Sequence, residues 1–125
     1  MAKAERFEDL QCWQAARELA RMVYAACECK KLAEDLETRA QPKGAALSSM
    51  SNIAEGFGRR SSIREFIRFL NFSEGSSIEV KSISYVLEDA GYLPMAVINQ
   101  LRDQSEKTKS LTIGLIRYLR GRLGS

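Results

Sequence analysis

The amino-acid sequence predicts an all-α protein, an antiparallel up-down four-helix bundle. Apolar residues recur at three- and four-residue steps along most of the 125-residue chain, which is the period of amphipathic helices. No stretch shows the strict alternation of apolar and polar residues that is typical of strands. Short polar connections separate four helical segments, and short connections favour antiparallel packing of neighbouring helices.

The composition indicates one soluble domain over residues 1–125. Hydrophobic residues make up 45% and charged residues 28%, the balance of an ordinary globular protein, and the length leaves no room for a second core. The N-terminal segment lacks a secretory signal, and no apolar run is long enough to cross a membrane. The 3 cysteines fit neither a C-x-x-C motif nor a secreted disulfide framework. We therefore expect a cytoplasmic protein without a membrane partner.

The first helix is predicted over residues 9–31. Asp9 is a suitable N-cap because its carboxylate can accept from the amides of the first turn. The apolar stripe of this helix consists of Leu10, Trp13, Ala16, Leu19, Ala20, Val23, Ala26 and Cys27. We expect Trp13 to lie in the core.

The second helix is predicted over residues 39–57, after a charged connection, and its start is ambiguous. Thr38 and Gln41 match a capping box, yet Pro42 would then occupy the fourth helical position and lose a backbone bond. Alternatively, Pro42 is itself the first helical residue. In both cases the apolar face consists of Leu47, Met50, Ile53, Ala54 and Phe57.

The third helix is predicted over residues 62–90 and the fourth over residues 94–120. Ser62 and Glu65 form a second capping-box match, and Gly91 followed by Pro94 ends the third helix. The seam of the third helix is a heptad-like row of Phe66, Leu70, Ser73, Ser77, Val80, Ser84 and Leu87. Small serines in this row allow a neighbouring helix to approach closely.

Several bulky apolar residues of the third helix lie off this seam. A bundle buries one stripe per helix, so Phe69, Phe72 and Ile83 are surplus to a single copy. Exposed apolar patches of several hundred Å² are rare on monomers. We therefore expect these three residues at an interface between copies of the chain; base stacking by such aromatic residues is the weaker alternative.

The sequence predicts no enzyme, no cofactor and no metal site. It contains 0 histidines, which removes Ser-His-Asp and Cys-His catalysis and histidine metal ligands together. Asn52 and Glu55 share a helix face, and Glu79 of the third helix could lie near them as a second carboxylate for acid–base work. Because no nucleophile accompanies them, we favour a structural role, in which Asn52 and Glu55 bond to Ser76 or Ser77 across the bundle or cap the turn.

Blocks of the sequence resemble a known family. The strongest is Ser51-Asn52-Ile53-Ala54-Glu55-Gly56-Phe57-Gly58-Arg59-Arg60-Ser61; others are Phe7-Glu8-Asp9-Leu10, Trp13-Gln14, Glu65-Phe66, Phe69-Leu70, Gly75-Ser76 with Glu79, and Gly91-Tyr92-Leu93. In this order the blocks are similar to those of the 23S rRNA-intervening sequence protein family, bacterial four-helix-bundle proteins with no established enzymatic activity. The resemblance implies a cytosolic bundle that assembles as a homopentameric ring. It also singles out family-motif residues of structural character: Trp13, Asn52, Glu55, Gly56, Gly75, Ser76 and Glu79.

Two groups of arginines suggest a nucleic-acid partner. The chain has a net charge of +3, and its arginines cluster as Arg59, Arg60, Arg64 and Arg68 and as Arg117, Arg120 and Arg122. Arg60, Arg64 and Arg68 follow one another at four-residue steps and would form one basic stripe. A charge run is usually a solvated face, but a ring would repeat each stripe and multiply its field.

Two functions therefore stay open at this point. The leading hypothesis is a non-enzymatic oligomeric scaffold that binds RNA through arginine–phosphate contacts. The alternative is a scaffold that binds only protein partners, itself included. Its arginines would then form ion pairs between subunits with Glu5, Glu8, Asp9, Glu34, Asp35 or Glu37.

Overall fold

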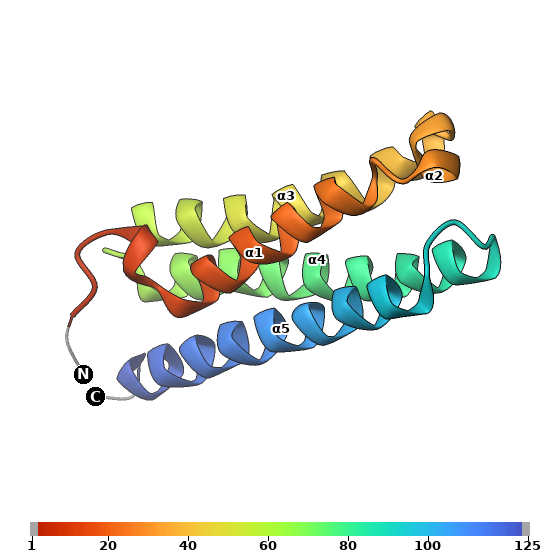
Figure 1. Ribbon diagram of the computed structural model, residues 1–125. Coiled ribbons are helices and arrows are strands. Elements are labelled where there is room, and N and C mark those ends of the chain that lie inside the picture. The colour runs from red at the N-terminus through yellow and green to blue at the C-terminus, as the bar shows by residue number, and fades with distance from the viewer. Residues whose placement is uncertain (1–2, 124–125) are drawn as a thin grey trace.

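The computed structural model describes residues 3–123, and every regular element in that range is helical. The elements are the 3-10 helix η1 (Phe7–Asp9) and the α-helices α1 (Gln11–Ala26), α2 (Lys30–Glu34), α3 (Leu36–Gly58), α4 (Ile63–Asp89) and α5 (Met95–Leu123). Four long helices lie side by side, successive long helices run in opposite directions, and the short α2 sits at one end (Figure 1). The predicted all-α bundle is confirmed.

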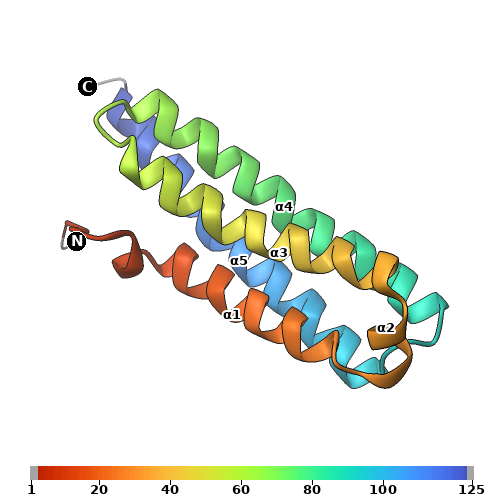
Figure 2. The same cartoon turned by 90° about the horizontal axis from the view of Figure 1, so that it is seen from above.

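The four long helices contact one another around a closed circuit. α3 packs against α4 and α1, and α5 packs against α4 and α1. The view from above shows α3 and α4 as a close antiparallel pair joined by a tight turn (Figure 2). This turn and the C-terminal part of α5 lie at the same end of the bundle.

The core is divided along the bundle axis into two apolar clusters. One is nearest α2 and the α4–α5 connection and includes the buried residues Leu32 and Leu93. The other is nearest the α3–α4 turn and includes Phe57, Phe66 and Leu119. Helical spacing along each chain segment places the apolar residues of both clusters inward.

A belt of buried hydroxyl side chains separates the two clusters. Its members are Ser49, Ser73, Ser77, Ser105, Thr108 and Thr112. The Ser49 hydroxyl lies 3.0 Å from that of Ser77 and 3.3 Å from that of Ser73, which bridges α3 to α4. The hydroxyls on α5 donate to carbonyls four residues earlier in their own helix. Among residues 3–123, no buried side-chain nitrogen or oxygen lacks a partner, so the belt is fully satisfied.

α4 follows its sequence prediction closely. Every residue of the predicted seam is buried: Phe66, Leu70, Ser73, Ser77, Val80, Ser84 and Leu87. The Ser62 hydroxyl accepts from the Glu65 amide at 3.2 Å, so the predicted N-cap is confirmed. Gly91 has φ +69°, and the amides of Gly91 and Tyr92 bond back to the carbonyls of Glu88 and Leu87, both at 3.0 Å. This is the Schellman ending that the glycine predicts.

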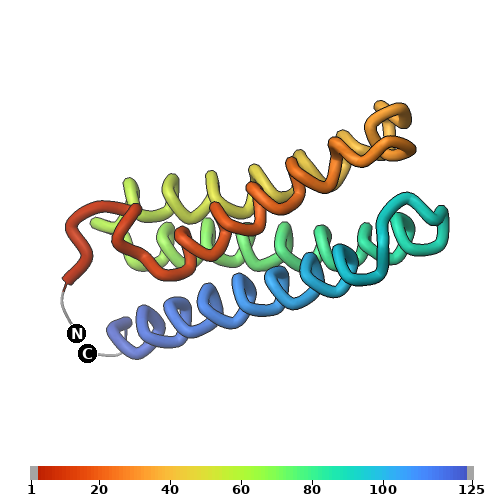
Figure 3. Tube along the Cα trace, viewed as in Figure 1, coloured from red at the N-terminus to blue at the C-terminus, as the bar shows by residue number. Residues whose placement is uncertain are grey.

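The single helix predicted over residues 9–31 is wrong, because the chain turns after Ala26 and restarts as α2. Figure 3 traces this path from α1 through α2 into α3. Cys29 is extended, with ψ 137°, and α2 then places Leu32 fully inside the core. Asp9 is not the N-cap of α1: it lies in η1, and its carboxylate accepts from the Arg6 amide at 3.2 Å.

α3 begins earlier than either predicted start. Its N-cap is Asp35, whose carboxylate accepts from the Thr38 amide at 3.1 Å and from the Thr38 hydroxyl at 2.8 Å. Pro42 is buried inside the helix, where it has no N–H to offer the Thr38 carbonyl. One backbone bond is lost, and the helix continues because the strong cap precedes the proline and a long buried face follows it.

The last helix starts where the sequence predicts and runs three residues further. The Pro94 carbonyl accepts from the amides of Val97 and Ile98, which starts α5 immediately after the proline. No helix within residues 3–123 combines the length and the hydropathy that a membrane span needs.

Candidate nucleic-acid interface

The turn between α3 and α4 brings the first arginine group to one end of the bundle. Arg59 is the C-cap of α3, Arg60 follows in the turn, and Arg64 and Arg68 lie in the first two turns of α4. The second group lies in the last turns of α5, at the same end (Figure 1). We call this region the arginine end; it consists of Arg59, Arg60, Arg64, Arg68, Arg117, Arg120 and Arg122.

Two of these arginines form loose, exposed ion pairs. Arg59 lies 3.6 Å from the Glu65 carboxylate and 3.9 Å from that of Glu55, and Arg68 lies 3.5 Å from Glu65. The arginine side chains are more than half exposed, so solvent screens these pairs and each contributes little to stability.

Arg60 departs from the predicted stripe. It precedes the first helical residue, Ile63, and its guanidinium turns back onto α3. There it donates to the Phe57 carbonyl at 3.0 Å and lies 4.0 Å from the centre of the Phe57 ring. The stripe at four-residue steps therefore holds only for Arg64 and Arg68.

Three arginines have no partner within residues 3–123. Arg64, Arg117 and Arg120 are exposed, and none forms a hydrogen bond, an ion pair or a ring contact with the described part of the chain. Arg122 lies 6.0 Å from the centre of the half-exposed Tyr118 ring. At the arginine end, the guanidinium groups of Arg64, Arg117 and Arg120 thus face solvent.

Three of the acids proposed as intersubunit partners already have partners inside the chain. Glu8 bonds to Arg6 at 2.7 Å, which lowers the pKa of the Glu8 carboxyl. Asp9 accepts from the backbone amides of Glu5 and Arg6, just before η1, and Asp35 caps α3 while it accepts from the Tyr92 hydroxyl at 2.7 Å. Hydrogen bonds from Tyr92 and Thr38 lower the pKa of Asp35. The remaining proposed acids are exposed: Glu5, Glu34 and Glu37.

The family-motif residues mainly shape the contact between α3 and α4. A Cβ on Gly56 would lie 2.9 Å from the Phe69 Cβ and 3.2 Å from the Phe66 carbonyl oxygen, so only glycine fits this crossing. The Ser76 hydroxyl donates to the Ser48 hydroxyl at 3.0 Å. Asn52 donates to the carbonyl of Ser48 at 2.8 Å, within its own helix.

The predicted bonds from Asn52 and Glu55 across the bundle are therefore wrong. Ser48 and Ser49 make the contacts with α4, because they face that helix directly. Glu55 is exposed beside Arg59, and Glu79 and Gly75 are also exposed. Trp13 is half-buried rather than fully enclosed; its ring packs edge-on against Phe7 with centres 5.2 Å apart.

The predicted interface residues separate into three environments. Phe69 is buried, since it fills the space that Gly56 leaves, so it is not available to a partner. Ile83 is half-buried against the core, and Phe72 is 47% exposed. The outer face of α4 exposes three further apolar side chains: Ile78, Tyr85 and Val86.

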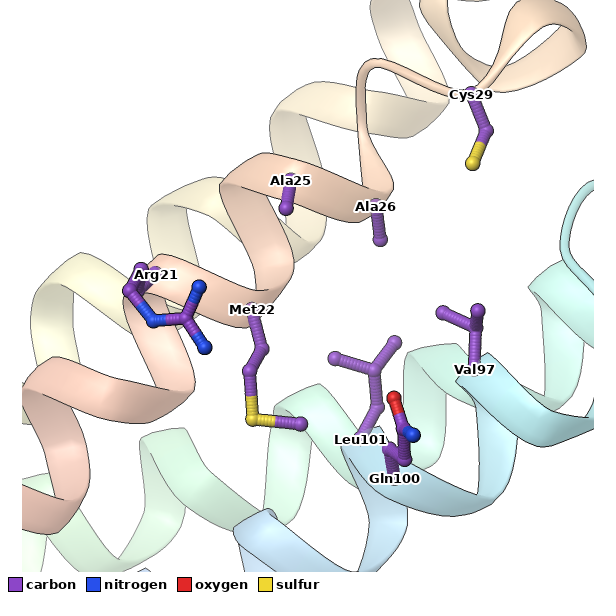
Figure 4. Close-up of a pocket in the computed structure, with 8 residues that line it drawn as sticks. All are labelled: Arg21, Met22, Ala25, Ala26, Cys29, Val97, Gln100 and Leu101. Atoms are coloured by element: carbon purple, nitrogen blue, oxygen red, sulfur yellow. The ribbon is translucent and has the colours of Figure 1, made fainter.

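A cavity of about 260 Å³ lies between α1 and α5 (Figure 4). Its lining is mainly apolar and includes Met22, Val97, Leu101 and Cys29, with Arg21 among the few polar residues. Arg21 is held in a two-bond ion pair with Glu18 on the same helix. The cavity brings together no nucleophile and base.

The cysteines and acids form no recognisable chemical centre in the described chain. Burial raises the pKa of the Cys12 thiol to about 11, and burial also raises the pKa of Cys27. Both behave as small apolar residues. Within residues 3–123, no three His, Cys, Asp or Glu side chains are grouped closely enough to hold a metal ion.

The fold and this end surface define an all-α helical-bundle protein with a basic end. A family model described as 23S rRNA-intervening sequence protein matches residues 8–114. The match spans most of the bundle, from η1 into α5, and the chain belongs to this family. No curated protein matches the chain.

Proposed function

We propose that this protein is a non-enzymatic cytoplasmic scaffold that assembles as a homopentamer and binds RNA through the arginine end. The observation that supports RNA binding best is the set of three exposed arginines without partners: Arg64, Arg117 and Arg120. Guanidinium groups of this kind suit phosphate oxygens, which they bind through two parallel hydrogen bonds. The family match assigns no activity to the chain, so it does not argue against RNA binding.

The outer face of α4 supports assembly. Phe72, Ile78, Tyr85 and Val86 are each about half exposed on that helix. Burial of such a row against a second copy would remove apolar surface from water, and the family resemblance suggests five copies. Light scattering should then give a particle of about 70 kDa, five times the chain mass of 14.0 kDa. A 14.0 kDa particle at micromolar concentration would refute assembly.

The test of RNA binding is a salt titration with a matched pair of variants. For single strands, log K falls by about 0.7 per decade of salt for each phosphate neutralised. Arg64→Ala with Arg120→Ala should therefore reduce the slope by about 1.4. Lys30→Ala with Lys31→Ala makes the same change in net charge at the opposite end and should leave the slope unchanged.

The scaffold that binds only protein is the competing outcome. If wild-type protein ignores RNA at low salt, the RNA proposal fails. If the double arginine variant instead dissociates the oligomer, the arginines serve as ion-pair partners between subunits, and the exposed Glu34 and Glu37 become their candidate partners.

A further inference from the structure

The outer face of α5 near its C-terminal end combines positive charge with one exposed aromatic ring. From Lys107 to Arg122 the sequence contains no acid. Tyr118 lies in this stretch and is 49% exposed, with the Arg122 guanidinium 6.0 Å from the centre of its ring. Arg117 precedes the tyrosine and has no partner within residues 3–123.

Two glycines keep the neighbourhood of Tyr118 open. Gly114 and Gly121 lie four residues before and three residues after it, which makes them its neighbours on the helix surface. A Cβ at either glycine would meet no atom within 4 Å. These two positions add no side chain beside the tyrosine ring, and 49% of Tyr118 remains exposed to solvent.

The rings of the other two exposed tyrosines of the long helices, Tyr24 and Tyr85, are each in contact with a cation. The ammonium of Lys43 lies 4.5 Å from the centre of the Tyr24 ring, and the guanidinium of Arg102 lies 3.7 Å from that of Tyr85. In both, a cation rests directly against the ring. At 6.0 Å, Arg122 is at the outer limit of such a contact.

We infer that Tyr118 stacks against a base of a single-stranded RNA whose phosphates bind the arginine end. This inference rests on the proposed function and adds the class of ligand. A duplex hides the faces of its bases, whereas a single strand presents them to aromatic side chains with little sequence preference. Arg117 and Arg122 supply positive charge beside the ring, where the phosphates flanking a stacked base would lie.

The experiment compares a labelled oligouridine of about 12 nucleotides with an RNA duplex of the same length, by fluorescence anisotropy at low salt. Tyr118→Ala should weaken single-strand binding by roughly 5- to 150-fold, the loss of one stacked base. Its salt slope should match that of wild type, because no phosphate contact is removed. Tyr118→Phe keeps the stacking ring and should bind like wild type.

Tyr24→Ala is the matched control, since it removes a tyrosine of similar exposure from another helix, and it should leave binding unchanged. Equal loss on single strand and duplex, no loss on the single strand, or a changed oligomer mass in Tyr118→Ala would overturn the inference. If wild type binds neither RNA, the proposed function fails and the inference with it. If RNA binds and the arginine variants act as expected but Tyr118→Ala has no effect, only the inference fails.

Discussion

Gly56→Ala tests how closely α3 and α4 approach each other. The added methyl group would lie 2.9 Å from the Phe69 Cβ, 3.1 Å from Phe66 Cδ1 and 3.2 Å from the Phe66 carbonyl oxygen. Two of these three atoms are fixed by the backbone of α4, so no rotamer change relieves the contact. The two helices must move apart, and the neighbouring hydroxyl bonds between them lengthen.

The expected magnitude follows from two opposing effects. Overpacking of a tight contact costs about 1–3 kcal/mol. Replacing a helical glycine by alanine recovers at most about 1 kcal/mol, and less in a last turn. The free energy of unfolding should therefore fall by about 1–2 kcal/mol, which lowers the melting temperature by about 4–8 °C in a chain of this size.

Gly58→Ala provides the matched control. Gly58 is two residues away in the same last turn of α3, and a Cβ there would meet nothing within 4 Å. This variant should be unchanged or more stable by about 0.5 kcal/mol. Urea unfolding followed by circular dichroism at one fixed protein concentration gives both values, since oligomerisation makes stability depend on concentration. Equal shifts for the two variants would refute the close crossing at Gly56.

Two further predictions concern titrating groups. Folding lowers the pKa of the Asp35 carboxyl from 3.8, through its bonds from Tyr92 and Thr38, and that of the Glu106 carboxyl from 4.5, through its bonds from Lys81 and Lys109. Their stabilisation is therefore complete above those values and is lost as pH falls through the lower folded values. With 0 histidines, the melting temperature should stay nearly constant from about pH 5 to 8 and fall below about pH 4.5; a steep change near pH 6.5 would contradict this assignment. Only Cys29 should react quickly with a thiol reagent in the native state, because Cys12 and Cys27 are buried. A rapidly reacting thiol that persists in Cys29→Ser would show that the buried pair is accessible.

The sequence predicts α4 well because its local signals and its packing agree. Ser62 caps the start, Gly91 ends the helix in the left-handed conformation, and the seam between them stays in one period for the whole length. A helix whose caps and apolar row point to the same bounds has few competing arrangements.

The region between α1 and α3 could not be predicted, because packing overrides local preference there. Leu32 comes five residues after Cys27, which is out of helical period, and the chain turns so that both side chains are buried. Pro42 argues locally against a helix interior, yet the Asp35 cap and the buried face beyond it keep the helix intact. Neither compensation is visible in a short window of sequence.

For the candidate site, the sequence identified the arginines but not their environments. The pattern shows that Arg60 and Arg64 are basic and close in sequence. Only the fold shows that Arg60 turns back onto Phe57 while Arg64 faces solvent. In the same way, Phe69 is buried because Gly56 makes room for it, and no property of Phe69 alone predicts that.

The hydroxyl belt also affects how the stability of the bundle responds to temperature. Unfolding raises the heat capacity in proportion to the apolar surface that it exposes, and exposed polar surface reduces that increase. A core whose middle layer consists of serine and threonine exposes less apolar surface on unfolding than a leucine-filled bundle of equal length. The stability curve of this protein should therefore be flatter, with weaker loss of stability on cooling than its length alone would suggest.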